Sequence, residues 1–254
     1  MITEPVRISS HLNKKTEGKQ GDLQMDVRIL KLIDGAKEAE GLTVIIDVFR
    51  AFTLEAYMFA AGAEYIYPVG ALEEAFELKK NRPDWILCGE RGGAKIEGCD
   101  YGNSPAQIAG AALNGKTIIH STSAGTQGIV NASGADEIIT ASLANADAVV
   151  SYILAKKPEK VSIVAMGKSG TKATQEDDLC AEYIKCRLEG GIMDVQKKAD
   201  ELRFNGGEHF FDLSNQSVFP MQDFYLSTKC NIFPFVICVG KDEEGKYRNH
   251  AVSV

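Results

Sequence analysis

The chain has 254 residues, of which 44% are hydrophobic and 25% are charged, and its formal net charge is −7. This composition is ordinary for a soluble protein, and the length predicts one domain, over residues 25–254, with a large buried core. The acidic balance argues against a nucleic-acid surface, which usually carries a basic excess. No apolar run reaches the roughly 18 residues of a transmembrane helix, so we expect no membrane contact.

The cysteines and the first residues indicate the compartment. Six cysteines are present, and no two form a Cys-x-x-Cys pair. No signal peptide precedes them, so we expect reduced thiols in a cytoplasmic protein. Residues 1–24 are polar and aperiodic, which predicts a flexible N-terminal extension. The oligomeric state stays open, and a homo-oligomer is one option.

In chain order, strand and helix patterns alternate from residue 26 onward. Runs of β-branched and alternating apolar residues predict strands at 26–33, 42–48, 65–69, 85–88, 117–120, 137–140, 161–165 and 233–239, with 35–41 as a connection. Apolar residues at helical spacing predict helices at 50–61, 72–80, 145–155, 194–204 and 206–213, and others that begin at Ser104, follow Thr126 and begin at Thr174. This alternation predicts an α/β fold, a three-layer α/β/α arrangement around a mostly parallel, mixed sheet.

The stretch 44–53 is the first candidate site. A β-branched run ends at Asp47, and Arg50 and Thr53 follow at intervals of three residues as a helical pattern begins. In open α/β sheets, ligands bind at the carboxyl ends of strands, beside helix N-termini that favour anions. We therefore expect Asp47, Arg50 and Thr53 to hold a charged small molecule. The alternative is an N-cap aspartate beside a solvated arginine.

Three more loops that follow strands carry polar groups, and in a doubly wound sheet we expect such loops to converge on one edge. Glu90 and Arg91 begin a glycine-rich loop, residues 121–126 are small and mostly hydroxylic, and Lys168 precedes an acidic helix start. Acids, arginines, hydroxyls and free backbone N–H groups suit a phosphate ester that is held together with a hard cation. Long loops in compact domains are usually functional, although Arg91 would also fit a plain turn.

Two helix starts and one histidine carry further signals. Glu176, Asp177 and Asp178 are adjacent acids, which either complement the helix dipole or relieve their repulsion by binding a divalent cation. Ser104 begins a Ser-Pro-Ala-Gln sequence, which predicts an N-cap and a capping box. His120 lies at a strand end, where it could face the site or be a buried structural histidine.

Several other site types are excluded. Gly167 and Lys168 suggest a P-loop, but Ser162 stands where its first glycine is required. The chain contains no Gly-x-Gly-x-x-Gly fingerprint and no Cys-x₅-Arg phosphatase loop, and its four histidines lack metal-site spacing.

Five motifs, taken in order, resemble the 2-phosphosulfolactate phosphatase family: Ile-Asp-Val-Phe-Arg-Ala-Phe-Thr, Gly-Glu-Arg-Gly-Gly, Gly-Cys-Asp-Tyr-Gly-Asn-Ser-Pro, Ser-Thr-Ser-Ala-Gly-Thr and Glu-Asp-Asp-Leu-Cys-Ala. The resemblance covers residues 26–188 and continues more loosely through Gly207, Asp223 and Pro234. It implies a cofactor, Mg²⁺, and a small anionic phosphoester substrate. The implied reaction converts 2-phospho-3-sulfolactate to 3-sulfolactate and phosphate, the type of step used in coenzyme M biosynthesis.

The resemblance and the loop chemistry together imply roles for individual residues. The implied metal ligands are the acids Asp47 and Glu176, with Asp177 or Asp178, and Glu90 is another candidate for a metal ligand or base. The residues expected to act on the phosphate are Asp47, Arg50, Glu90 and Arg91. The residues expected to bind the rest of the substrate are Thr53, Ser121, Ser123, Gly125, Thr126 and Lys168, with Lys95 as an alternative cation. Whether Asp47 attacks phosphorus, giving an aspartyl-phosphate, or only binds the metal stays open.

Two positions depart from the family pattern. Phe52 stands where Thr or Ser is usual, and Ala124 stands where the asparagine of an Asn-Gly-Thr sequence is usual. The loss of a polar side chain near a ligand changes the choice of substrate more readily than the reaction. Two alternatives therefore remain: a phosphatase for a different small phospho-acid, and a non-catalytic phosphometabolite-binding protein.

Overall fold

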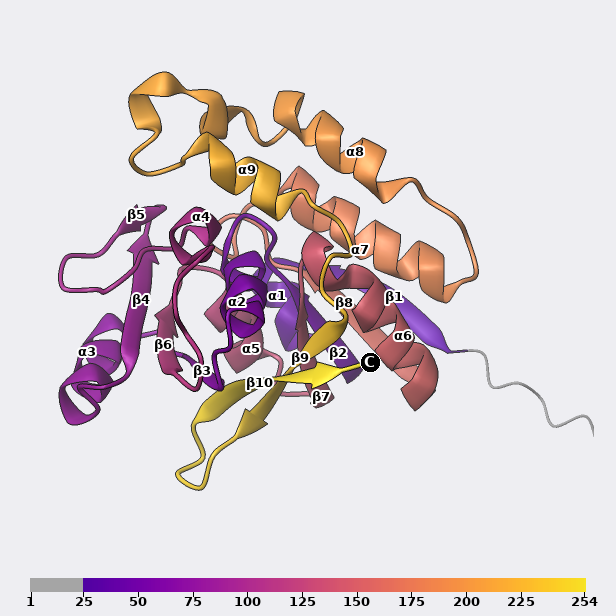
Figure 1. Ribbon diagram of the computed structural model, residues 1–254. Coiled ribbons are helices and arrows are strands. Elements are labelled where there is room, and N and C mark those ends of the chain that lie inside the picture. The colour runs from indigo at the N-terminus through magenta and orange to yellow at the C-terminus, as the bar shows by residue number, and fades with distance from the viewer. Residues whose placement is uncertain (1–24) are drawn as a thin grey trace, which may run out of the picture.

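The computed structural model describes residues 25–254, and the extension predicted over residues 1–24 lies outside them. Ten strands form one mixed sheet in the order β1-β8-β2-β7-β9-β10-β3-β6-β4-β5, and helices cover both faces (Figure 1). The predicted three-layer α/β/α fold is therefore confirmed. None of the six cysteines, which all lie in this part of the chain, is in a disulfide. No helix of residues 25–254 combines the length and the apolar character that a membrane span requires.

Four parallel strands form a first group, which leads to Asp47. They are β1 (Asp26–Lys31), β8 (Lys160–Ala165), β2 (Gly41–Ile46) and β7 (Ala135–Ala141). The last residue of β2, Ile46, is opposite both Ala165 and Ala141. These three strands therefore end at the same level, with Asp47 directly after β2 and the loop of Lys168 after β8.

Three parallel strands form a second group, which carries the other predicted loops. They are β3 (Tyr65–Pro68), β6 (Thr117–Ser121) and β4 (Ile86–Arg91). Gly89 of β4 is opposite Ser121 of β6, so the glycine-rich and hydroxylic loops leave the sheet side by side. β4 runs beyond its predicted end because Glu90 and Arg91 pair with β5 (Ala94–Lys95). Gly92 and Gly93 have φ of +59° and +88°, the left-handed values that this two-residue turn requires.

A C-terminal hairpin joins the two groups. β9 (Phe235–Lys241) pairs antiparallel with β7, and β10 (Tyr247–Ser253) pairs antiparallel with β9 and with β3. The sequence pattern predicts β9 but not β10, because Arg248, Asn249 and His250 interrupt the apolar alternation of that strand. The sheet is therefore two parallel groups separated by an antiparallel hairpin.

Helices cover each strand group on both sides. They are α1 (Leu32–Lys37), α2 (Ala51–Ala60), α3 (Leu72–Asn81), α4 (Pro105–Ile108), α5 (Gly125–Asn131), α6 (Ala146–Lys156) and α7 (Gln175–Leu188). In the first group, Val44 and Ile46 pack against α6 and α7, whereas Ile45 packs against α1 and α5. In the second group, Ile118 packs with α2 and α4, and Ile119 packs with α3. This alternation follows from the two-residue period of strand side chains.

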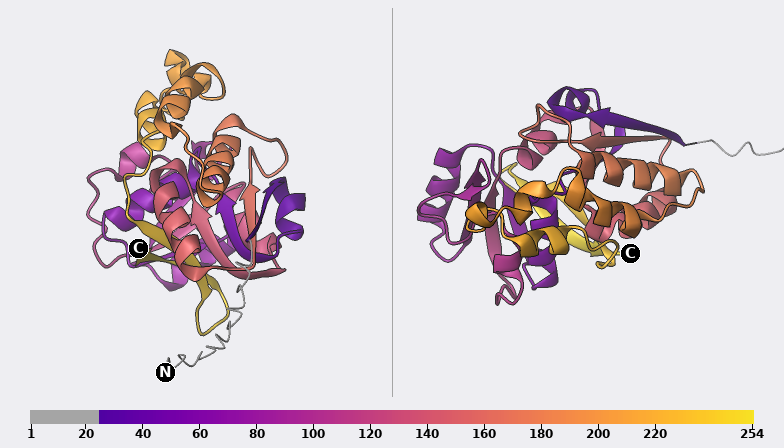
Figure 2. Two further views of the ribbon diagram at one scale, coloured as in Figure 1. Left: turned by 90° about the vertical axis from the view of Figure 1, so that its right-hand side faces the viewer. Right: turned by 90° about the horizontal axis from the view of Figure 1, so that it is seen from above.

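Residues 193–231 form an irregular helical segment along one edge of the molecule, which we call the C-terminal segment. It contains α8 (Val195–Glu201), three 3₁₀ turns and α9 (Met221–Ser227). Figures 1 and 2 show this orange segment beyond α7 and α4, where α8 contacts α7 and α9 contacts α4. The helix predicted over 206–213 is instead two short turns, because Asp212 Oδ1 accepts hydrogen bonds from Ser214 and starts a new turn.

Two other local expectations are wrong. Ser104 is the N-cap residue of α4, but its hydroxyl donates to Asp223 Oδ1 at 2.8 Å, and Gln107 accepts from the Gly102 amide, so no capping box forms. The first strand ends at Lys31, and α1 follows at once where the sequence predicts more strand and a connection. Leu32 causes this break, because its φ of +65° cannot continue a strand.

The substitution Gly128→Ala tests how closely α5 packs on the sheet. A Cβ at Gly128 would lie 2.5 Å from Ile45 Cγ2 and 2.7 Å from Met166 Sδ. We expect Gly128→Ala to lower the free energy of unfolding in urea by about 1–3 kcal/mol, the usual cost of overpacking a core. Gly240→Ala is the matched control, because the nearest atom to its Cβ position is Arg248 O at 3.7 Å. Equal stability of the two variants would contradict this close approach.

Candidate active site

Three acidic side chains meet between the ends of β2 and β8. Asp47 follows β2, and Glu176 and Asp177 lie in the first turn of α7, the helix that follows β8. Their exposed fractions are 7%, 6% and 2%. Burial is the main cause that raises the pKa of Glu176 to about 7 and that of Asp177 well above its usual range, and the charge of Asp47 adds to both shifts. Like charges are therefore held close together in a nearly dry place.

Asp47 follows a strand of the first group and lies close to loops of the second group. Burial raises the pKa of Asp47 to about 6, and the charge of Glu90 adds to the shift. The Ala51 amide opposes it by donating a hydrogen bond to Asp47 Oδ1 at 3.1 Å. A Cβ on Gly125 would lie 3.3 Å from Asp47 Oδ2, so α5 begins directly against this carboxyl. The loop after β6 thus reaches the residue after β2, as the sequence predicts.

Asp177 connects the ends of β2 and β8 by hydrogen bonds. Its Oδ1 accepts a hydrogen bond from the Val48 amide and its Oδ2 one from the Gly167 amide, both at 2.7 Å. Both oxygens of Asp177 thus hold the backbone. Asp47 and Glu176 remain the acids that are best placed to meet a ligand.

Asp178 turns away from this acidic group. Its Oδ2 pairs with Lys31 Nζ at 2.7 Å, beside the end of β1. The structure therefore does not bring the third acid of this helix start to the site. Within residues 25–254, moreover, no three His, Cys, Asp or Glu side chains are arranged as they stand to hold one metal ion.

Glu90 connects the two loops of the second strand group. Its Oε1 accepts hydrogen bonds from the Ser123 amide at 2.8 Å and the Ser123 hydroxyl at 2.9 Å, and its Oε2 accepts one from the Gly93 amide at 2.7 Å. The residue is only 5% exposed. The side chain expected to be a base or metal ligand therefore already has three donors, and it sets the positions of both loops.

Arg91 and Lys168 are exposed cations at the strand ends. Arg91 Nη2 donates to Ser121 Oγ and to Gly70 O, both at 3.1 Å, so its guanidinium is fixed beside the hydroxylic loop. Lys168 lies in the loop after β8, and its side chain is exposed. Both residues are therefore accessible to an anion from solvent, and their assignment to the substrate stays a prediction.

Two of the expected hydroxyl ligands instead bond to backbone carbonyls. Thr53 Oγ1 donates to Val48 O at 2.8 Å, and Thr126 Oγ1 donates to Thr122 O at 3.1 Å. Their exposed fractions are 0% and 1%. These threonines stabilise the starts of α2 and α5 and do not present their hydroxyls to a ligand.

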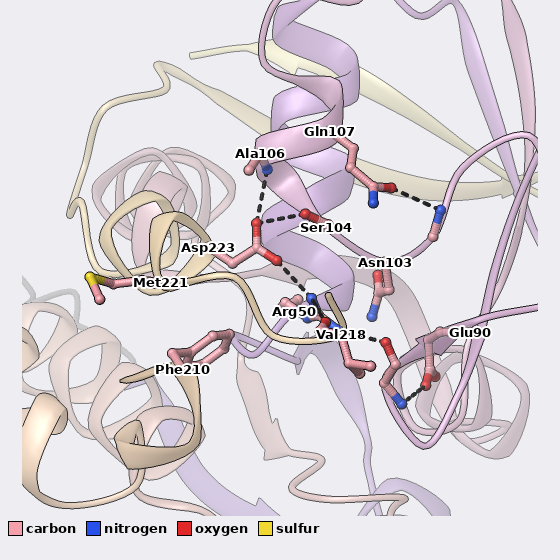
Figure 3. A network of polar contacts seen from close by, with 12 residues as sticks. Arg50, Glu90, Asn103, Ser104, Ala106, Gln107, Phe210, Val218, Met221 and Asp223 are labelled. Carbon is pink, nitrogen blue, oxygen red and sulfur yellow. Dashed lines mark hydrogen bonds and ion pairs between the residues drawn. The ribbon is translucent and has the colours of Figure 1, made fainter. Parts of the chain in front are cut away.

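Arg50 is expected to bind phosphate, but a buried network occupies its guanidinium (Figure 3). Its Nη1 donates to Asp223 Oδ2 at 2.6 Å and to Val218 O at 3.0 Å, and its Nη2 donates to Gly93 O at 2.8 Å. The side chains of Arg50 and Asp223 are 2% and 0% exposed. The ring of Phe219 lies 4.8 Å from the guanidinium carbon. Arg50 therefore fastens the C-terminal segment and the β4–β5 turn to the end of β2.

Asp223 also holds the loop before α4. Its Oδ1 accepts hydrogen bonds from Ser104 Oγ at 2.8 Å and from the Ala106 amide at 2.9 Å (Figure 3). Nothing local in the sequence marks this role, because Arg50 lies 173 residues away along the chain. The loose resemblance around Asp223 is the one signal that could have pointed to it.

The C-terminal segment also reaches the acidic group. A Cβ on Gly206 would lie 3.6 Å from Glu176 Oε2. Burial, and after it the charges of Arg50 and Lys168, lowers the pKa of His209. The segment therefore adds His209 as a second basic side chain close to Lys168. The sequence pattern does not reveal this residue, because His209 lies outside every predicted strand-end loop.

The comparison with known sequences agrees with this arrangement of loops. The sequence profile of the 2-phosphosulpholactate phosphatase family matches residues 28–209. The chain belongs to this family. The matched range includes all four strand-end loops and ends at His209, so Asp223 lies beyond it.

Three relatives of the 2-phosphosulpholactate phosphatase family show the extent of the similarity. A protein of Bacillus subtilis (strain 168) is 35% identical over 208 residues, 80% of this chain and 89% of the relative. A protein of Carboxydothermus hydrogenoformans is 43% identical over 164 residues, 63% of this chain and 66% of the relative. A protein of Thermotoga petrophila is 36% identical over 166 residues, 65% of this chain and 70% of the relative. Each carries the name "Probable 2-phosphosulfolactate phosphatase".

The substitution Asp223→Ala tests the structural role of the Arg50 ion pair. We expect it to lower the free energy of unfolding in urea by about 3–5 kcal/mol, because it leaves a buried charge without a partner. The double variant Arg50→Met/Asp223→Leu should be more stable than Asp223→Ala, since no buried charge remains. If the double variant lost as much free energy of unfolding as the Arg50 and Asp223 single variants together, that result would contradict a direct pair.

Proposed function

We propose that the chain hydrolyses the phosphate monoester of a small, multiply anionic acid, with 2-phospho-3-sulfolactate as the first candidate substrate. One observation carries the proposal: Asp47 and Glu176 are both almost fully buried, and both have raised pKa values. The family to which the chain belongs agrees with it. Acids perturbed in this way by burial and by neighbouring charges are typical of catalytic sites. The step would be of the type used in coenzyme M biosynthesis.

Asp47 and Glu176 are the residues that would hold the expected Mg²⁺. Carboxylate oxygens are the donors that hard cations prefer, so the chemistry of the pair fits the ion. Mg²⁺ usually binds through one or two carboxylates, together with water and substrate phosphate, which agrees with two available acids in place of three. When bound, the ion would offset the negative charge on the phosphate oxygens. Asp177 would support the pair by fixing the strand ends.

Arg91 is the cation that we assign to the phosphate group. Its guanidinium is exposed and already fixed by Ser121, so little side-chain entropy remains to be lost when it binds an anion. The amide of Gly125, at the start of α5, is directed at the Asp47 carboxyl and helps to hold it. Arg91 would stabilise charge that moves onto the phosphate oxygens in the transition state.

Lys168 and His209 are the groups that we assign to the second anionic end of the substrate. The charge of Lys168 acts on the pKa of His209, so the two side chains are near each other. Gly206, three residues before His209, lies close to Glu176, since a Cβ on it would be 3.6 Å from Glu176 Oε2. A sulfonate or carboxylate would reduce the repulsion between these two basic groups.

A second candidate function is supported by the two departures from the family pattern. Phe52 and Ala124 belong to the same buried cluster, and a Cβ on Gly125 would lie 2.9 Å from Phe52 Cζ. This part of the chain therefore places apolar surface directly behind the start of α5. A phospho-acid with a less polar end would suit it. Values of kcat/KM for phosphosulfolactate, phosphoglycerate and phospholactate distinguish the two candidates.

The substitution Asp47→Asn tests the central residue. We expect phosphate release to fall to the level of the buffer blank, because Asn is neutral and a poor ligand for a hard cation. Thermal stability should not decrease, since the change removes a carboxyl that is costly to ionise in its buried place. Full activity in a folded Asp47→Asn protein would overturn the assignment. Glu97→Gln, at an exposed position in the glycine-rich loop, is the matched control and should stay active.

Removal of divalent cations tests the metal. We expect EDTA to abolish phosphate release and added Mg²⁺ to restore it. Mg²⁺ should also raise the melting temperature of the parent protein and not that of Asp47→Asn, because ligand binding to the folded state stabilises it. Undiminished turnover in EDTA would remove the metal from the proposal while leaving the phosphatase activity in place.

A further inference from the structure

We propose that Asn103 is a further substrate-binding residue of this site. Its side-chain amide donates an N–H to an oxygen of the phosphate ester, in an orientation that His120 and Glu55 fix. The inference rests on the proposed function for the identity of the ester. Asn103 lies in the Gly-Cys-Asp-Tyr-Gly-Asn-Ser-Pro motif, to which the site described above assigns no ligand contact.

A series of buried polar contacts leads from α2 to Asn103. Glu55 Oε1 lies 2.9 Å from His120 Nδ1, and His120 Nε2 lies 3.3 Å from Asn103 Oδ1. The exposed fractions of Glu55, His120 and Asn103 are 0%, 1% and 7%. A carboxylate only accepts hydrogen bonds, so Nδ1 of His120 carries a proton and the ring orientation is fixed.

Two donors fix the Glu55 carboxylate at the start of this series of contacts. Asn249 Nδ2 donates to Glu55 Oε2 at 2.8 Å, and His120 donates to the other oxygen. At the other end of the series, His120 Nε2 lies 3.3 Å from the amide oxygen of Asn103. The amide nitrogen of Asn103 therefore points away from His120.

This amide nitrogen is a donor without a partner. Among residues 25–254, Asn103 Nδ2 has no acceptor within hydrogen-bond distance, although the residue is more than nine-tenths buried. Figure 3 shows the Asn103 side chain directed toward the side of the network where Arg50 and Glu90 lie. The polar atoms of residues 25–254 that are closed off from solvent without a partner do not include this nitrogen, so its N–H groups are accessible to a ligand oxygen.

The loop that carries this amide is fixed on both sides. Before it, the Gly102 amide donates to Gln107 Oε1 at 3.2 Å. After it, Ser104 Oγ donates to the fully buried Asp223. The donor is therefore preorganised, which is the condition under which hydrogen bonds stabilise a transition state effectively.

The series of contacts from Glu55 to Asn103 also lies within electrostatic range of the acidic group. Burial raises the pKa of Asp47, and the positive charge of His120 counteracts that shift. Asp47, which we assign to the cation, and His120, which orients Asn103, are thus close. Asn103 would then meet the same phosphate group as Arg91 from the side of α4.

Two variants of Asn103 separate a binding role from a structural one. Asn103→Asp keeps the oxygen that faces His120 but replaces the N–H donors, whereas Asn103→Ala removes both. We expect kcat/KM for 2-phosphosulfolactate to fall about 100-fold in Asn103→Ala, a typical loss for one transition-state donor. It should fall further in Asn103→Asp, because a carboxylate repels the phosphate. A merely structural residue gives the opposite order, since Asp preserves the buried contact and Ala does not.

Two further variants complete the comparison. Gln107→Ala removes one of the contacts that fix this loop and leaves the Asn103 amide in place, so kcat/KM should fall by less than in Asn103→Ala. In His120→Gln, kcat should fall about 10-fold with little change in KM, as expected for a residue that positions another. A loss of thermal stability at an unchanged kcat would show that His120 does not act through Asn103.

The same proteins are titrated calorimetrically with inorganic phosphate, which separates this inference from the proposed function. If the parent protein binds phosphate without hydrolysing the ester, the proposed function fails, and the order of phosphate affinities (parent, then Asn103→Ala, then Asn103→Asp) still supports the role of Asn103. If Asn103→Asp equals or exceeds Asn103→Ala in turnover and in phosphate affinity, the inference is overturned. A parent protein that neither hydrolyses the ester nor binds phosphate contradicts both.

Discussion

Carboxyl groups that are buried beside one another repel, and the end of β2 is built around such a group. Asp47 follows the strand directly, and α7 brings Glu176 and Asp177 against it with almost no exposed surface. Burial raises the pKa of all three acids. A hydrophobic core would exclude this arrangement, because nothing in it offsets the desolvation of charge. In a site that binds a cation and an anion together, the cation offsets this repulsion, and the clustered carboxylates then favour binding.

A second constraint determines how the remaining loops reach this group. The parallel strands belong to two groups that only a C-terminal hairpin connects, so the sheet alone does not hold their ends together. Direct contacts do so: Gly125 starts α5 against Asp47, and Arg50 ties the β4–β5 turn to the C-terminal segment through Asp223. The buried ion pair is therefore a structural part of the site, although neither of its charges is available to a ligand.

The sequence predicts most strands correctly, because local apolar periodicity decides them. Val44 to Ile46 read as a buried strand, and Asp47 is at its end in the structure. The loops after β2, β4 and β6 do lie together, but the sequence does not show that an antiparallel hairpin separates the strands that carry them. Predictions failed where a distant residue decides the outcome. Ser104 and Arg50 both bind Asp223, 119 and 173 residues away along the chain, and no local pattern contains that information.

The central claim is that Asp47 and Glu176 bind a divalent cation next to the substrate phosphate. An anomalous-difference map from crystals that contain Mn²⁺ and inorganic phosphate tests it most directly, because Mn²⁺ accepts the same oxygen ligands as Mg²⁺. The account predicts one strong peak in contact with both carboxylates, with phosphate between that peak and Arg91. A map with Mn²⁺ and phosphate bound elsewhere, and neither of them at Asp47, would contradict it.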